Sequence, residues 1–87
     1  MQELLRFTGR SNGLSFFLPP KFDFVFYEDK FVMYRGSKVS RTVAYSDITE
    51  VVALSKKVTF INCKPIGINI YESNDELLGK IKEITGK

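Results

Sequence analysis

A regular alternation of apolar and polar residues, starting at Phe22, constrains the fold more than any other feature of the chain. Phe22, Phe24 and Phe26 alternate with Asp23 and Val25, as on the two faces of an extended strand. This period predicts a strand over 22–27, which a tight acidic turn at 28–30 connects to the next strand. Further strands are expected over 31–35, 41–45, 49–54, 58–62 and 67–71, with a short apolar one over 14–18.

The period changes near the C-terminus. The run Ser73-Asn74-Asp75-Glu76 has the spacing of a helix capping box, in which a Ser hydroxyl and a Glu carboxylate satisfy the first backbone N–H groups. The apolar residues that follow fall on one helical face: Leu77, Leu78, Ile81 and Ile84. The pattern predicts an amphipathic helix over 74–85. We therefore expect an α+β, mainly β fold, in which a small antiparallel barrel or bent sheet of six to seven strands is capped by this helix.

The length of 87 residues predicts a single domain over 1–87. Residues 1–10 show no clear period and are expected to be either a short amphipathic helix or an edge strand, with a turn over 9–13. The alternative is that residues 1–13 lie at the periphery of the domain. The single cysteine, Cys63, follows an apolar strand and is interpreted as a small buried hydrophobe. One cysteine cannot form an intramolecular disulfide, and no apolar run approaches the roughly 20 residues that span a bilayer. We expect a cytoplasmic location, with peripheral membrane contact as an extension of it.

The chain lacks the residue types that most enzymes use. It contains no histidine, and its lone cysteine therefore has no imidazole partner. The acidic pairs Glu28/Asp29 and Asp75/Glu76 have structural roles as a turn and a helix start. There is no glycine-rich phosphate loop and no cluster with the spacing of metal ligands. We expect a protein that is not an enzyme and needs no cofactor or metal.

The basic residues allow a binding role. Thirteen Lys and Arg against ten acidic residues give a net charge of +3. Two predicted hairpin loops carry cations, and at one end of the sheet they would form a single patch: Arg35, Lys38 and Arg41 on one loop, Lys56 and Lys57 on the other. Such a patch would attract anionic lipid head groups or nucleic-acid phosphates. The alternative is that these residues keep the domain soluble and protect its sheet edges.

Aromatic residues are expected mostly in the core, since a chain of this size needs its large side chains inside. Tyr34 and Tyr45 are the candidates for an exposed platform on which bases could stack. The apolar run over 14–18 is either a core strand or a surface for homodimer formation. An incompletely closed barrel could also accept a partner strand at its edge.

The order of these elements resembles the pleckstrin-homology (PH-like) superfold, and the local sequence is similar to bacterial and archaeal PH or GRAM-like domains. The resemblance spans about 22–86 and rests on four segments: Tyr27-Glu28-Asp29-Lys30, Phe31 to Gly36 with its Tyr-Arg-Gly ending, Thr42 to Tyr45, and Ser46-Asp47-Ile48 leading into Val51. It implies an antiparallel barrel with a C-terminal helix, which presents loops and a groove to lipids, peptides or partner domains.

Together these observations predict a non-enzymatic binding or interaction module. Its expected ligand is a protein partner or an anionic membrane surface, and a homodimer is a further option. The alternative is a small basic nucleic-acid-binding protein that uses the same cations together with Tyr34 or Tyr45.

Overall fold

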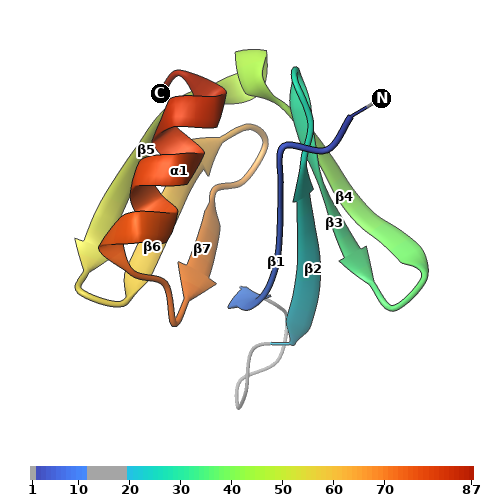
Figure 1. The fold of residues 1–87 in the computed structure, drawn as a ribbon, viewed down its shortest axis with the longest axis horizontal. Coiled ribbons are helices and arrows are strands. Elements are labelled where there is room, and N and C mark those ends of the chain that lie inside the picture. The colour runs from blue at the N-terminus through green and yellow to red at the C-terminus, as the bar shows by residue number, and fades with distance from the viewer. Residues whose placement is uncertain (1, 12–19) are drawn as a thin grey trace.

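The computed structural model describes residues 2–11 and 20–87, and within them seven strands form one antiparallel sheet followed by one helix (Figure 1). The strand order across the sheet is β4-β3-β2-β1-β7-β6-β5. The elements are β1 (Leu5–Ser11), β2 (Lys21–Phe26), β3 (Lys30–Arg35), β4 (Lys38–Ala44), η1 (Tyr45–Asp47), β5 (Ile48–Ser55), β6 (Val58–Cys63), β7 (Ile68–Tyr71) and α1 (Asp75–Thr85). The expected fold class is confirmed, with seven strands.

The sheet curls into a half-barrel, and α1 lies across the concave side of its β5–β7 half (Figure 1). Ile81, at the centre of the helix, is fully buried in the same cluster as the sheet's inward-facing residues. Leu77, Leu78 and Ile84 pack against that cluster and are half-buried. The predicted apolar stripe therefore covers the core.

Phenylalanine rings fill the β1–β4 half of the core. Phe24, Phe26 and Phe31 are fully buried, as the two-residue alternation predicted. The Phe7 ring stacks on Phe24 with centroids 4.9 Å apart, and Phe26 stacks on Phe31 at 4.8 Å. Such pairs stabilise by about 0.5–1.5 kcal/mol beyond the apolar area they bury. Phe60 was also expected inside but is only half-buried on β6.

The N-terminal segment differs from its expected role. Leu5–Ser11 is neither a helix nor an edge strand, because β1 lies in the middle of the strand order. It pairs with β2 from Leu5↔Phe26 to Arg10↔Lys21, and with β7 at Arg10↔Tyr71 and Ser11↔Ile70. The short strand and the dimer surface expected over 14–18 lie outside the described residues.

The helix begins one residue later than the capping-box pattern indicated. Asn74, not Ser73, is the N-cap, and its side chain accepts a hydrogen bond from the Leu77 N–H at 2.8 Å. Ser73 is buried, and its hydroxyl bonds that of Thr59 at 2.7 Å. Gly86, at φ +72°, ends the helix in the left-handed conformation that glycine adopts without strain.

Candidate functional site

Arg41 has a structural role and is less exposed than the other four predicted cations. It is half-buried, and its guanidinium donates to the main-chain carbonyls of Lys64 at 3.2 Å and Ile66 at 2.6 Å. These contacts connect β4, at one edge of the sheet, to the loop between β6 and β7. Both bonds come from the Nη2 group of Arg41, so this part of the guanidinium holds the loop. That Arg41 also binds an external anion stays a prediction.

Cys63 lies beside this contact, with its sulfur 3.6 Å from the Arg41 guanidinium. The thiol is buried, and burial raises its pKa, an effect that the nearby Arg41 cation partly offsets. The cysteine is therefore a protonated packing residue at neutral pH, as the sequence predicted.

Tyr45 does not form an exposed platform. Only 8% of its surface is exposed, and its hydroxyl donates to the Tyr27 carbonyl. Burial, reinforced by Asp29, raises its pKa to about 12. Tyr34 is half-buried on the outer face of β3. Its hydrogen bond with Tyr27 raises the pKa of the Tyr27 phenol. The two candidate aromatics are therefore not side by side on a surface, and the expectation for Tyr45 is wrong.

The remaining four predicted cations lie at the tips of two hairpins. Arg35 and Lys38 flank the β3–β4 turn, and Lys56 and Lys57 form the β5–β6 turn; all four are exposed. Figure 1 shows both tips at the lower end of the half-barrel, on opposite sides of it. The two hairpins share an end of the sheet, as the patch required, but they do not touch.

Two cations that sequence reasoning missed lie between these hairpins. Arg10 and Lys21 are paired across β1 and β2 on the outer face, and Arg10 is also paired with Tyr71 of β7. Tyr71 in turn pairs with Val58, the residue after Lys57. In the sequence, the feature that could have indicated these two cations is that they flank the apolar run over 14–18. Their pairing, however, depends on the register.

We call this region the basic end, defined by Arg10, Lys21, Arg35, Lys38, Lys56 and Lys57. Five of the six side chains are exposed, and Arg10 is half-buried. Glu72, in the turn after β7, brings one carboxylate close to it. Asp23, two residues after Lys21, accepts a 2.6 Å hydrogen bond from the Thr8 hydroxyl. Asp75 and Glu76, in the first turn of α1, add two exposed carboxylates at the same end. The six cations outnumber these four acidic residues.

The opposite end of the half-barrel carries acidic turns. The β2–β3 turn contains Glu28 and Asp29, and η1 contains Asp47; all three are exposed. Both segments lie at the upper end in Figure 1. This end also carries exposed cations, because Lys64 adjoins Asp47 and because Lys82 and Lys87 lie at the C-terminal end of α1, so it holds charges of both signs.

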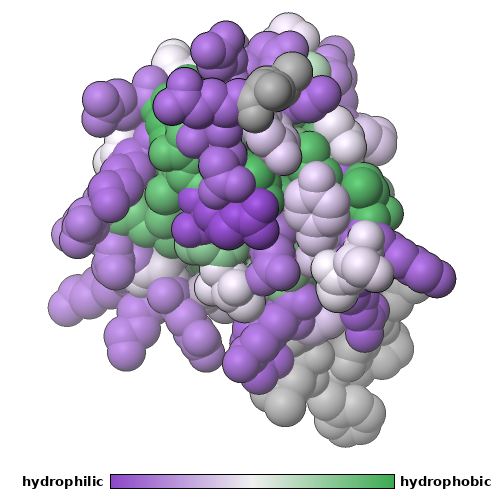
Figure 2. Space-filling model, turned by 45° about the vertical axis from the view of Figure 1, so that its right-hand side comes forward, coloured by the Kyte–Doolittle hydropathy of each residue, from purple (hydrophilic) through white to green (hydrophobic). Residues whose placement is uncertain are grey.

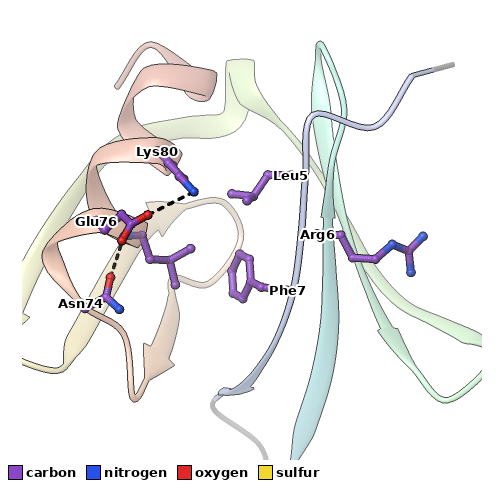
Figure 3. A pocket seen from close by; sticks show the side chains of 7 residues that line it. Leu5, Arg6, Phe7, Asn74, Glu76 and Lys80 are labelled. Carbon is purple, nitrogen blue, oxygen red and sulfur yellow. Dashed lines mark hydrogen bonds and ion pairs between the residues drawn. The ribbon is translucent and has the colours of Figure 1, made fainter.

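A shallow groove runs between β1 and α1 (Figure 3). It consists of two adjoining hollows of about 320 Å³ and 270 Å³ that share Leu5 and Lys80 in their lining. Leu5 and Phe7 point from β1 towards the helix, while Arg6 points away (Figure 3). In the space-filling view, hydrophobic surface shows among hydrophilic side chains on the face where α1 and β1 meet (Figure 2).

No protein-family model matches this chain, and no curated protein of similar sequence was found. Among the described residues, no group of His, Cys, Asp or Glu is arranged to hold a metal ion. The helix in that part of the chain is too short and too polar to cross a membrane.

Proposed function

We propose that this protein is a non-enzymatic binding module that docks on anionic membrane surfaces through its basic end. The observation that carries the proposal is the convergence of six Lys and Arg residues on one end of the half-barrel. They come from strands and turns far apart in the sequence. Each basic residue near an anionic leaflet contributes about 1 kcal/mol, so several together give measurable binding.

The arrangement of the sheet supports a relationship with PH-like domains, which the sequence suggested. An antiparallel sheet in the order β4-β3-β2-β1-β7-β6-β5, closed by a C-terminal helix, fits what that resemblance implies. We include this relationship in the proposal, together with a cytoplasmic location from which the domain reaches the membrane peripherally.

Vesicle sedimentation tests the membrane proposal. We expect partitioning onto vesicles of phosphatidylcholine with phosphatidylserine and none onto phosphatidylcholine alone. Lys56→Gln with Lys57→Gln removes two charges near the surface and should weaken partitioning by about 30-fold. The matched control is Lys82→Gln with Lys87→Gln, which removes two exposed charges at the end of α1. Equal binding by both double variants would refute the role of the basic end.

The nucleic-acid alternative uses the same cations and is tested in the same experiment. A short single-stranded and a short double-stranded DNA replace the vesicles at physiological salt. A nucleic-acid binder would show log affinity falling linearly with log salt, with a slope close to the number of phosphates contacted. We expect weak DNA binding, because buried Tyr45 does not offer a stacking surface beside the cations.

A further inference from the structure

One side of β1 lacks a strand partner over most of its length. The Ser11 N–H donates to the Pro20 carbonyl at 3.2 Å, which assigns Ser11 and every second residue before it to hydrogen bonding with β2. Antiparallel pairing alternates, so the main-chain groups of Thr8 and Arg6 are directed to the other side of the strand.

On that other side, β7 pairs with β1 at Arg10 and Ser11 in the part of the chain that the structure describes. The chain then turns away at Glu72, which has a φ of +62°, and enters α1. Within the described residues, no strand continues alongside Thr8 and Arg6. Arg6 lines the groove between β1 and α1, and the N–H and C=O groups of Thr8 are directed to the same side of the strand.

The groove offers apolar contacts at alternate positions along this strand. Leu5 and Phe7 point into it from β1, and Leu77 and Ile84 line it from the helix. These four side chains are half-buried, and Leu4 at the end of the groove is 47% exposed. The basic end contributes no residue to this lining.

The charges of the lining are nearly balanced. Lys80 pairs with Glu76 at 3.4 Å, and Arg6 is held by Glu3 at 3.0 Å. The Lys80–Glu76 pair lies at the rim of the groove, whereas the Arg6 side chain points away from it; both pairs are solvent-exposed. The side chains that enter the groove should therefore be apolar and uncharged, since neither a strongly acidic nor a strongly basic segment finds a complementary surface there.

We propose that the groove between β1 and α1 binds an extended, apolar peptide segment of a partner protein, which joins the sheet as a strand beside β1. A strand supplies the donors and acceptors that Thr8 and Arg6 need. A helix or a lipid tail in the same place would bury these main-chain groups without partners, at about 1–3 kcal/mol each. Alternate side chains of the peptide pack on Leu5, Phe7 and Leu77, and the others face solvent. This proposal is independent of membrane binding.

Proline substitution tests strand addition directly. Thr8→Pro removes the backbone N–H of residue 8, which is directed to the groove side of β1. The hydrogen bonds between β1 and β2 stay in place, because proline is tolerated at a free strand edge. Thr8→Val is the matched control, because it loses the hydroxyl bond to Asp23 but keeps the N–H. The probe is a library of random 12-residue peptides displayed on phage, from which selected sequences are synthesised for titration.

We expect the selected peptides to carry apolar residues at every second position. Thr8→Pro should weaken their binding by about tenfold or more, while Thr8→Val stays within about twofold of the wild type. Amide hydrogen exchange at Arg6 and Thr8 should be fast in the free protein and slow in the complex. This second readout uses the wild-type chain, so it decides the question if Thr8→Pro does not fold.

Several results would overturn the proposal. They are failure to select any peptide, selection of helical i, i+3, i+4 spacing, and unchanged exchange at Arg6 and Thr8 on peptide binding. Protection of these amides in the free protein that rises with protein concentration would instead identify a second copy of the chain as the occupant. Loss of vesicle binding in the Lys56→Gln/Lys57→Gln variant has no bearing on any of these readouts.

Discussion

The β1–β4 half of the sheet and the β5–β7 half are stabilised in different ways. In the first, β1 and β2 pair without interruption from Leu5↔Phe26 to Arg10↔Lys21, and stacked phenylalanines fill the inner face. In the second, the pairing of β5 with β6 shifts register twice, and the inward-facing residues of β6 and β7 are aliphatic apart from Cys63 and Thr59. The first half therefore packs largely on its own rings, whereas the second needs α1 to cover it.

The two halves meet through few main-chain contacts, and this determines what each cation does. Among the described residues, β1 and β7 share two register pairs, and Arg41 spans from β4 to the loop after β6. Arg41 is on the same hairpin as Arg35 and Lys38, but its guanidinium hydrogen-bonds to the loop after β6 and so joins the two halves. Its neighbours at the tip stay exposed. The comparison teaches that closure of the half-barrel separates structural cations from cations that can bind a ligand.

The largest loss of stability should come from a substitution in the phenylalanine core of the β1–β4 half. Phe24→Ala removes a fully buried ring that stacks on Phe7, and we expect a loss of about 3–5 kcal/mol in the free energy of unfolding. Urea denaturation measures this loss. Phe60→Ala is the control, because the half-buried ring of Phe60 should cost clearly less. Equal costs for the two would show that the β1–β4 half does not depend on its ring stack.

The second half should depend on the helix. Ile81→Ala leaves a cavity beneath α1 and should cost about 2–5 kcal/mol. Leu78→Ala, on the same helical face but only half-buried, should cost less. A near-zero cost for Ile81→Ala in urea denaturation would mean that α1 is peripheral to the core.

The connection between the halves can be broken with one residue. Arg41→Met keeps an unbranched side chain but leaves the Lys64 and Ile66 carbonyls without their charged donor, and we expect a loss of about 1–3 kcal/mol. Arg35→Met at the exposed hairpin tip should stay within about 0.5 kcal/mol of the wild type. Faster amide exchange in β4 of the Arg41 variant would show that stability is lost where β4 contacts the loop between β6 and β7. If Arg35→Met is the more destabilising change, our assignment of the two arginines is reversed.

Tyr45 gives a smaller, pH-dependent effect. Its pKa is raised to about 12 in the folded protein, chiefly by burial, whereas an exposed tyrosine ionises near 10. The folded state therefore favours the neutral phenol. The resulting stability is fully present below about pH 10 and is lost as the pH rises from there towards 12. Tyr45→Phe should flatten this part of the stability curve relative to the wild type. Parallel curves for the two proteins between pH 9 and 12 would contradict the assignment.

Much of the fold could be predicted because it follows from local patterns. The alternation from Phe22 identified β2 and the buried rings, and the change of period identified α1. The role of Leu5–Ser11 was missed because the segment has no clear period of its own. Its place in the sheet comes from pairing with β2 and β7, which lie on opposite sides of it.

The candidate site was predicted less completely than the fold. Loop position correctly indicated exposure for Arg35, Lys38, Lys56 and Lys57. It failed for Tyr45, which lies in η1 and is buried, and it did not indicate that Arg41 on β4 is half-buried. Only the tertiary contacts decide which way such side chains face. Arg10 and Lys21 are adjacent because β1 and β2 pair in this register. An analysis of either segment alone could therefore not have assigned them to the basic end.

A heteronuclear NMR titration of the labelled protein with nanodiscs containing phosphatidylserine tests the central claim most directly. We predict saturable shifts and line broadening at the basic end, at Arg10, Lys21, Arg35, Lys38, Lys56 and Lys57. Nanodiscs of phosphatidylcholine alone should leave these signals unchanged. Perturbations confined to the β2–β3 turn and η1 or to the groove beside α1, or no perturbation with either lipid, would contradict the account.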